Sequence, residues 1–484
     1  MKKRTIGLGL LLFVMVPMAA KVKLPALVSD NMVLQQQTTV TLWGMAKAGK
    51  AVKVRTSWDS HDTIVQSDVE GKWRLQVETP VAGGPYEMSF DDGDGEVKVS
   101  NVLIGEVWFC CGQSNMEMPV QGFHRQPVAG AQDILLKAQK EVPIRAFTVE
   151  KNVSAIPLET CGGKWDEHTP QGVARTSATA YFFARYLNEV LHVPVGLVIA
   201  DWGGTRIQSW MSEQSIAPFG QDTSHLGRDW DKNELGREHK ACVLYNAMIV
   251  PLLPYTIKGM LWYQGESNTA EYDLYKKMMP AFVSDLRQRF AVGDFPFYYV
   301  QTAPFMYSGL EKGKAAHFRE VQQQLMSIIP NSGMAVTMDI GEKTCIHPAD
   351  KEKVGNRLAY WALAKTYGRN DFGYSGPVYN SMKVEGNKVY LYFDNVPEGV
   401  APLERELKGF EIAGGDKKFY PARAVVEAAR GLLSVSSDNV SVPVAVRYGY
   451  TDYIKGGLFD VYGLPASSFR TDNWEDNEIE RVTK

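Results

Sequence analysis

The chain has few cysteines, almost no net charge and a single long apolar run, and each shortage excludes a class of protein. Five cysteines in 484 residues are too few and too scattered for a disulfide scaffold, and their spacing fits no zinc pattern. We therefore expect buried free thiols and no metal site. The formal net charge of -3, without a cluster of Lys and Arg, argues against a nucleic-acid partner.

The one long apolar run lies at the N-terminus. Residues 1–4 are basic, and residues 6–18 form an apolar run that is short for a membrane span. Residues 19–20 are the small side chains that a signal-peptide cleavage site requires. This pattern predicts a signal peptide over residues 1–20 and an exported protein, periplasmic or extracellular. Because no second long apolar segment follows, we expect no membrane span in the mature chain.

The rest of the chain divides into three regions, as its length of 484 residues allows. Residues 21–102 alternate apolar and polar residues in short stretches between Gly-rich turns, which predicts an N-terminal β-sandwich domain. Residues 103–368 alternate strand-like and helix-like runs, which predicts a parallel sheet covered by helices on both faces. Residues 369–484 are β-rich again and form the predicted C-terminal domain.

Within the middle region the apolar pattern predicts individual elements. The expected strands cover residues 102–111, 195–200, 257–263, 297–301 and 334–339. The expected helices cover residues 176–187, 272–290 with an interruption at Pro280, 317–329 and 353–367.

Four short motifs lie where these elements begin or end. Gly-Gln-Ser-Asn at 112–115, Asp-Trp-Gly-Gly-Thr-Arg at 201–206 and Gln-Gly-Glu-Ser-Asn at 264–268 each follow a strand, and Ile-His-Pro at 346–348 precedes a helix. Ligands of parallel sheets bind at the carboxyl ends of the strands. The three strand-exit turns are therefore expected to converge on one crevice.

These residues suit the cleavage of an ester, which needs a nucleophile, a base and donors for the developing oxyanion. Ser114 is the predicted nucleophile, because the turn after a strand holds a serine rigidly and exposes its Oγ. His347 is the predicted base. The backbone N–H groups of Ser114 and of Gly203 or Gly204 are the predicted oxyanion donors, since glycine leaves room for the substrate oxygen.

The order of the four motifs resembles the SGNH hydrolase family, and more narrowly its sialate O-acetylesterase and carbohydrate acetylesterase branch. The likeness runs from about residue 103 to about residue 368 and continues weakly to residues 462–472. It implies an α/β fold in which a flavodoxin-like, parallel-sheet hydrolase domain is flanked by all-β, sandwich-like domains. It also implies a serine esterase that removes O-acetyl groups from carbohydrates, with sialic acids as substrate and no cofactor. A side-chain amide of the oxyanion hole falls on Gln264.

The chain departs from that family pattern before the histidine. Many relatives carry an acid two or three residues upstream, where this chain has Cys345 and Thr344. A backbone carbonyl of the 341–345 loop then orients the imidazole, giving a Ser-His dyad, or a carboxylate from elsewhere does so. The dyad is the interpretation that we favour. The candidate carboxylates are Glu266, Asp339 and Glu342.

Arginine and tryptophan side chains near the motifs are candidates for substrate binding. Arg206 and Arg319 suit a substrate carboxylate, although an exposed helical charge is the alternative for Arg319. Trp210, like Trp202 and Trp262, suits a sugar ring, with core packing as the alternative.

Two other functions stay open on the sequence. One is an esterase acting on acetylated xylan or another plant glycan, and the other is a non-catalytic carbohydrate-binding protein. The sequence does not determine the oligomeric state.

Overall fold

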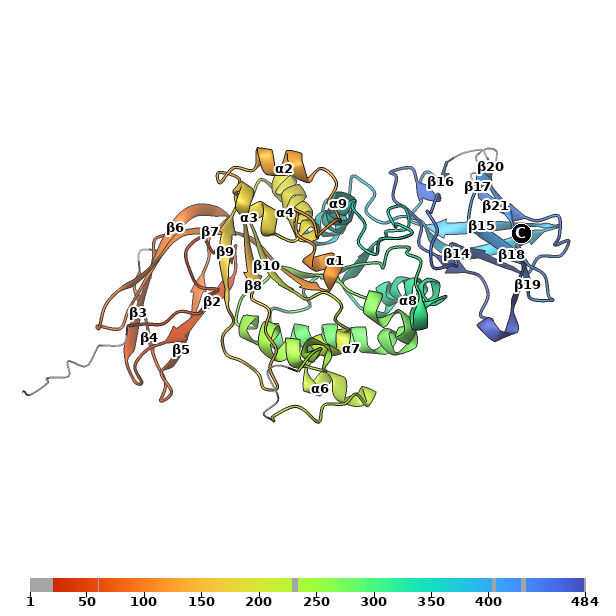
Figure 1. Ribbon diagram of the computed structural model, residues 1–484. Coiled ribbons are helices and arrows are strands. Elements are labelled where there is room, and N and C mark those ends of the chain that lie inside the picture. Colours follow the sequence, from red (N-terminus) through yellow and green to blue (C-terminus); the bar gives the residue numbers. More distant parts are fainter. Residues whose placement is uncertain (1–20, 60, 229–233, 403–405, 428–431, 483–484) are drawn as a thin grey trace, which may run out of the picture.

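The computed structural model describes residues 21–59, 61–228, 234–402, 406–427 and 432–482. The predicted signal peptide, residues 1–20, lies outside the described residues. Figure 1 shows three parts in chain order along an elongated molecule: a β-rich N-terminal part, an α/β centre and a β-rich C-terminal part.

The centre is built on a sheet with the strand order β13-β12-β11-β7-β10-β8-β9. Neighbouring strands are parallel except for β8 and β9. Taken in chain order, β10-β7-β11-β12-β13 reads 2-1-3-4-5, which is the flavodoxin-like order, and β8 and β9 extend one edge. The strands are β7 (Val97–Gly112), β8 (Ile144–Val149), β9 (Gly163–Glu167), β10 (Val195–Asp201), β11 (Gly259–Tyr263), β12 (Phe297–Val300) and β13 (Ser332–Ala335).

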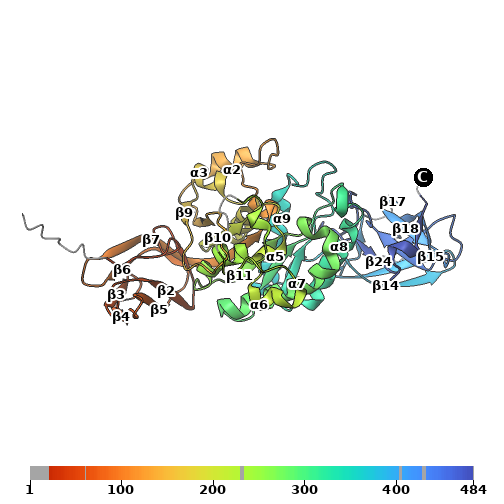
Figure 2. The ribbon, with the colours of Figure 1, turned by 60° about the horizontal axis from the view of Figure 1, so that its bottom comes forward.

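Helices cover both faces of this sheet (Figures 1 and 2). On one face lie α4 (Ala178–Leu191) and α9 (Lys351–Trp361), and on the other lie α7 (Tyr272–Phe290) and α8 (Ala315–Ile328). Successive residues of β7 divide between the two cores, Trp108 with α4 and α9 and Phe109 with α7 and α8. Because strand side chains alternate between faces, a sheet covered on both sides requires a continuous apolar run.

Short helices join these elements. They are α1 (Ser114–Glu117), α2 (Ala131–Lys137), α3 (Pro170–Arg175), α5 (Ile207–Trp210) and α6 (Glu213–Ile216).

Strand β7 belongs to two parts of the molecule. Its first half pairs with β1 and β6 of the N-terminal part, and its second half pairs with β10 and β11. The boundary predicted between residues 102 and 103 therefore falls inside a continuous strand. The other N-terminal strands are β1 (Val33–Gln35), β2 (Thr39–Met45), β3 (Ala51–Thr56), β4 (Thr63–Gln66), β5 (Lys72–Glu78) and β6 (Gly83–Asp91).

The C-terminal part contains two five-stranded sheets, β14-β15-β21-β20-β17 and β24-β22-β18-β19-β25. Leu391 and Val435 of the first share one buried cluster with Ile412 and Val446 of the second, so the sheets pack face to face. The strands of the two sheets are β14 (Val378–Glu385), β15 (Lys388–Asp394), β17 (Glu406–Leu407), β18 (Phe410–Ala413), β19 (Lys418–Pro421), β20 (Arg423–Glu427), β21 (Leu432–Ser436), β22 (Ala445–Tyr448), β24 (Phe469–Arg470) and β25 (Glu480–Arg481). A separate antiparallel pair consists of β16 (Val400–Ala401) and β23 (Phe459–Asp460).

The predicted elements of the centre are present with small shifts of their ends. Helix α7 has the predicted bounds, and it continues through Pro280 instead of being interrupted there. Strand β13 ends at Ala335, four residues before the predicted end. Helix α9 ends at Trp361 and continues as a π-helical turn over Ala362–Thr366.

Three further observations concern the described residues only. All five cysteines are free, and Cys110, Cys111 and Cys242 are buried. No group of three or more His, Cys, Asp or Glu side chains is arranged to hold a metal ion. No helix has the length and apolar character needed to cross a membrane.

Candidate active site

Three strands end level with one another at the centre of the sheet. Asp201 of β10 and Tyr263 of β11 both pair with Gly112, the last residue of β7. The turn after β7 bonds to both neighbours: Trp202 N–H donates to the Gly112 carbonyl at 3.1 Å, and Gln113 N–H donates to the Tyr263 carbonyl at 3.0 Å. The three strand-exit motifs are therefore side by side, as their position in the sequence predicted.

Gly112 lets the serine turn pass close to β11. Its φ is +153°, and a Cβ at this position would lie 2.1 Å from the Tyr263 carbonyl oxygen. Ser114 then begins the short helix α1, with its side chain partly exposed. Among the described residues, Ser114 Oγ and Ser114 N–H have no hydrogen-bond partner. Both atoms are free to meet a substrate.

The Gly-Gly turn lies against the serine, but one of its two N–H groups is already engaged. A Cβ on Gly203 would come within 3.3 Å of Ser114 Cβ. Gly203 N–H donates to Glu117 Oε2 at 2.5 Å, and Lys151 Nζ donates to the other oxygen of that carboxylate at 2.5 Å. Gly204 has a φ of +75°, and its N–H makes no hydrogen bond to any described residue. Gly204 is thus the free donor of the pair.

Gln264 is placed differently from the prediction. The side chain is fully buried, and its Nε2 donates to Gln113 Oε1 at 3.1 Å, the Thr205 carbonyl at 3.1 Å and Asn268 Oδ1 at 2.8 Å. The amide is committed to three protein acceptors and has no exposed surface. We correct its assignment from oxyanion donor to a residue that joins the three turns.

His347 is held by a residue that the sequence did not single out. Its Nδ1 lies 2.6 Å from Oε1 of Gln126, and its ring packs edge-on to Phe123 with centroids 5.3 Å apart. Gln126 and Phe123 exchange two backbone hydrogen bonds of 3.0 Å, so a tight turn presents both side chains. Because an amide oxygen only accepts hydrogen bonds, Nδ1 carries the proton and Nε2 keeps its lone pair.

The His347 imidazole is kept neutral by its surroundings. Burial, together with the positive charge of Lys351, which acts in the same direction, lowers its pKa to about 4. The carboxylate of Glu117 opposes them. A neutral imidazole with a free Nε2 is the form that accepts a proton in general-base catalysis.

The turn that carries Ser114 and the loop that carries His347 are joined through their neighbours. Asn115 Nδ2 donates to the Ile346 carbonyl at 3.1 Å. The residue after the serine therefore contacts the residue before the histidine.

None of the three candidate carboxylates orients the histidine. Asp339 forms a two-pronged ion pair with Arg357 at 2.7 and 2.8 Å. Glu342 accepts from Ala349 N–H at 2.9 Å, and Glu266 accepts from Asn115 Nδ2 at 2.6 Å. The prediction that a backbone carbonyl of the 341–345 loop orients the imidazole is wrong as well. The Nδ1 atom of His347 contacts the side chain of Gln126 instead.

Two of the three predicted substrate-binding residues are structural. Trp210 is fully buried, and its Nε1 donates to Thr205 Oγ1 at 3.0 Å. Arg319 is also fully buried and donates to Ser468 Oγ at 2.9 Å and to the Gly449 carbonyl at 3.1 Å, which fastens α8 to the C-terminal part. Neither side chain reaches solvent, so the prediction that they bind substrate is wrong.

Arg206 remains at the surface beside the site. Its side chain is 49% exposed and lies 3.3 Å from a carboxylate oxygen of Glu271. It lines a cavity of about 260 Å³ together with His225, His239 and Lys240. A Cβ on Gly204 would lie 3.7 Å from His239 Cε1, so this cavity borders the Gly-Gly turn.

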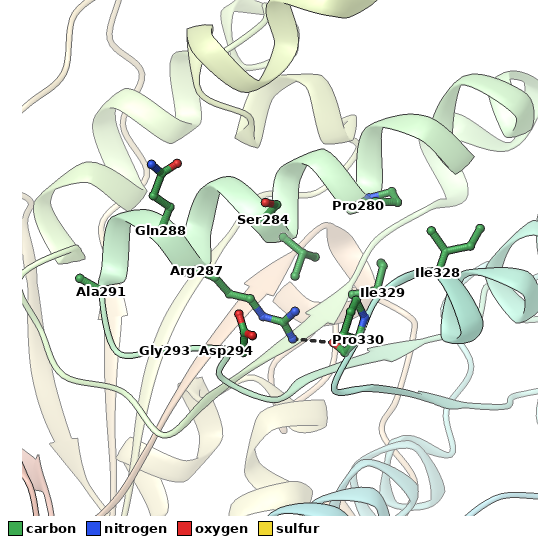
Figure 3. Close-up of a pocket in the computed structure, with 11 residues that line it drawn as sticks. Pro280, Ser284, Arg287, Gln288, Ala291, Gly293, Asp294, Ile328, Ile329 and Pro330 are labelled. Atoms are coloured by element: carbon green, nitrogen blue, oxygen red, sulfur yellow. Dashed lines mark hydrogen bonds between the residues drawn. The ribbon is translucent and has the colours of Figure 1, made fainter.

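A larger cavity, of about 700 Å³, lies away from these residues (Figure 3). It is bounded by the second half of α7, the end of α8 and the residues that enter β12 and β13. Arg287 lines this cavity, and its guanidinium donates to the carbonyls of Phe295 and Pro330, each at 2.8 Å. These segments precede their strands, so the cavity lies at the opposite edge of the sheet from Ser114.

The functional residues that the sequence did not reveal have no motif of their own. Gln126 belongs to an irregular loop. Glu117 follows the serine by one helical turn, and its spacing is the only signal that could have pointed to it. Lys351 is the first residue of an amphipathic helix, where a lysine is ordinarily exposed.

The chain is similar over much of its length to known carbohydrate esterases. A family model described as carbohydrate esterase, sialic acid-specific acetylesterase, matches residues 104–364. The sialate O-acetylesterase of Mus musculus is 29% identical, with 92% of this chain and 93% of that protein aligned. That of Homo sapiens is also 29% identical, with 88% and 87% aligned.

A solved structure shares the whole architecture. The crystal structure of a carbohydrate acetylesterase from Xanthomonas citri is 33% identical, has a TM-score of 0.83, and covers 94% of this chain and 100% of its own. The likeness therefore includes the β-rich parts on both sides of the centre.

Proposed function

Because the chain belongs to the carbohydrate esterase family of sialic acid-specific acetylesterases, we propose that it removes O-acetyl groups from sialic acids through an acetyl-enzyme on Ser114. The coarser statement holds for the family: the chain is a carboxylic ester hydrolase that acts on acetylated carbohydrates. The proposal adds the nucleophile, the base and the sugar.

One observation carries the mechanism. Ser114 Oγ has no hydrogen-bond partner among the described residues, while the Nδ1 proton of His347 is fixed by Gln126. Nε2 of His347 is the atom that takes the Ser114 proton as Oγ attacks the acetyl carbonyl carbon. The resulting imidazolium returns the proton to the sugar oxygen as the C–O bond breaks, and the deacetylated sugar leaves.

Water completes the cycle. Nε2 takes a proton from water, the hydroxide oxygen bonds to the acetyl carbon, and the proton passes to Ser114 Oγ as acetate departs. In both halves the carbonyl oxygen becomes an oxyanion. The N–H groups of Ser114 and Gly204 are its donors in our proposal, since neither has an acceptor among the described residues and the Gly-Gly turn lies against Ser114.

Gly203 joins this oxyanion hole only if Glu117 releases its N–H. The Lys151 ammonium already holds the other oxygen of Glu117 and would keep that carboxylate paired after such a release. In our proposal Gly203 therefore supports the turn in the resting enzyme.

Two observations support the proposal that the substrate is a sialic acid: the family of the chain and the position of Arg206. A sialic acid carries a carboxylate, and the planar guanidinium of a partly exposed arginine beside the Gly-Gly turn suits its two oxygens. The Glu271 carboxylate competes for the same group. A neutral acetylated glycan such as acetyl xylan would need no such arginine.

Acetate release from the purified protein tests the function. We expect wild type to release acetate from O-acetylated sialic acid faster than from acetylated xylan, and Ser114→Ala to release none. Ser327→Ala, which removes an exposed hydroxyl at the end of α8, serves as the matched control and should retain full activity. Acetate release that survives Ser114→Ala would exclude the mechanism. No release by wild type from any acetylated sugar would favour a binding protein.

We also propose that the protein is exported, on the strength of the N-terminal residues 1–20 alone. N-terminal sequencing of the protein recovered outside the cytoplasm should begin near Lys21. An intact Met1 on the mature protein would exclude this.

A further inference from the structure

Next to the nucleophile turn lies a buried polar cluster that the proposed mechanism does not use. It consists of Asn115, Glu266 and Lys351. The side chains of Asn115 and Lys351 are 0% exposed and that of Glu266 is 5% exposed. They come from α1, the segment Glu266–Glu271 after β11, and the first residue of α9. Burying polar groups costs folding free energy unless they form hydrogen bonds with one another.

Asn115 is the centre of the cluster. Its Nδ2 donates to Glu266 Oε1 at 2.6 Å and to the Ile346 carbonyl at 3.1 Å. Its Oδ1 accepts from Lys351 Nζ, and its backbone carbonyl accepts from Thr179 Oγ1 of α4 at 3.1 Å. Both amide hydrogens and the amide oxygen are therefore used. An apolar side chain of the same size would leave each partner without its hydrogen bond.

Lys351 is buried without a carboxylate against it. In the described part of the chain it forms no salt bridge, and its ammonium lies 5.5 Å from the centre of the Tyr263 ring. Burial lowers its pKa to about 7, while Glu266, Cys345 and Glu342 act in the opposite direction. Below neutral pH this site thus holds a cation in the protein interior.

We propose that Asn115, Glu266 and Lys351 form a positioning clamp, which fixes the His347 loop against the nucleophile turn and holds the Lys351 ammonium on the amide that joins the two. The inference rests on the proposed function, because it takes His347 as the base. Asn115 follows the nucleophile and Lys351 follows the histidine by four residues, so one amide spans both catalytic segments.

Two charged groups act on the pKa of His347, Lys351 from α9 and Glu117 from α1. They act in opposite directions on its pKa, and the lysine has the larger effect. The Glu117 carboxylate is also shared between Lys151 and the Gly203 N–H. A like charge close to a titratable group disfavours its protonated form. Burial is the largest cause of the low His347 pKa, and the ammonium that the clamp holds lowers this pKa in the same direction.

The test is the titration of His347 itself, followed by NMR of ¹⁵N-histidine in the Ser114→Ala protein. The His347 signal is assigned by its loss in His347→Gln. Lys351→Met keeps the length of the side chain and removes its charge, and we expect it to raise the His347 pKa by about one unit. Lys353→Met is the matched control. It removes a lysine two residues further along α9 that is 52% exposed, and should leave the titration unchanged.

The proposal is overturned if Lys351→Met unfolds cooperatively on heating, as a folded protein does, and its His347 pKa stays within about 0.3 pH units of the wild-type value. The readout needs no esterase activity, so it stays informative if Ser114 proves not to be the nucleophile. In that case acetate release fails to respond to Ser114→Ala while the titration still reports on the clamp.

Asn115→Asp gives a second readout if Lys351→Met does not fold. The carboxylate keeps the acceptor for Lys351 and loses the amide donor to Ile346 and Glu266. We expect kcat on acetylated sugar to fall at least about tenfold with little change in KM, since a base displaced by a fraction of an ångström loses rate rather than binding. An unchanged kcat would overturn the positioning role.

Discussion

The side-chain oxygen of Gln126 lies 2.6 Å from Nδ1 of His347, in the position where many serine hydrolases place a carboxylate. An amide holds the imidazole in the same tautomer and brings no negative charge. The imidazolium formed during attack is then less stabilised than beside a carboxylate, while the resting imidazole is more securely neutral.

Replacing Gln126 tests its orienting role directly. Gln126→Leu removes the acceptor, and we expect kcat to fall about 100-fold, the lower end of what a positioned base contributes. Gln126→Glu keeps the acceptor and adds a charge, so activity should persist with a raised His347 pKa. Gln121→Leu, at an exposed position of the same loop, is the control. Equal kcat for Gln126→Leu and wild type would contradict the assignment.

The fall of kcat/KM on the acid side of the pH profile should occur at an unusually low pH. Because burial and Lys351 lower the His347 pKa to about 4, the base stays unprotonated above that pH and is protonated below it. We expect kcat/KM to be level from neutral pH down to about 5 and to fall tenfold per pH unit below about 4. A neutral acetylated sugar is the substrate for this measurement, so that no substrate group titrates. A fall of kcat/KM centred near pH 6.5 would mean that the imidazole that acts as base is exposed to solvent.

Asp339 should matter for stability and little for catalysis. It forms a buried pair with Arg357, with side chains 9% and 6% exposed. Asp339→Asn leaves the guanidinium without its partner, and we expect unfolding to become easier by about 3 kcal/mol. Chemical denaturation measures this, with kcat measured in parallel. A loss of kcat on the order of 10⁴-fold would instead make Asp339 a triad member.

Gln264 should behave as a structural residue. Gln264→Ala removes the donor to three buried acceptors, so we expect a loss of about 3 kcal/mol in unfolding free energy. An oxyanion donor would give the reverse result, a large loss of kcat in a protein of normal stability. The ratio of the two effects decides between the roles.

Arg206 should discriminate between charged and neutral sugars. We expect Arg206→Gln to raise KM for O-acetylated sialic acid about tenfold, as for a lost charge-assisted contact, and to leave KM for acetylated xylan unchanged. Arg175→Gln is closely matched, because Arg175 is 50% exposed and also pairs with a carboxylate. An Arg206→Gln enzyme with the same preference as wild type would remove sialic acid recognition from this residue.

Local pattern predicted those parts of the site that strand geometry controls. Continuous apolar runs mark a sheet buried on both faces, and the carboxyl ends of its strands meet at one edge. Ser114, Gly204 and Gln264 were for that reason expected side by side, and the registers of β7, β10 and β11 place their turns there. The same reasoning predicted α7 between its observed ends.

The errors arose where burial depends on distant segments. Trp210 and Arg319 have chemistry that suits a sugar acid, yet each is enclosed by parts of the chain that no local pattern brings near. For Arg319 these partners lie about residues 449–468, in the C-terminal part. The same limit hid Gln126, whose relation to His347 spans 221 positions.

By itself the sequence determined the order of strands and helices and the place of Ser114 and His347 at the ends of these elements, because each depends on residues adjacent in the chain. Only the tertiary structure decided which polar groups are free and which are occupied. A hydrogen-bond donor serves catalysis only when no protein acceptor already holds it. Gly203, Gln264 and Arg319 have such acceptors, while Ser114 and Gly204 have none in the part of the chain that the structure describes. That difference is set by contacts between segments that the fold alone brings together.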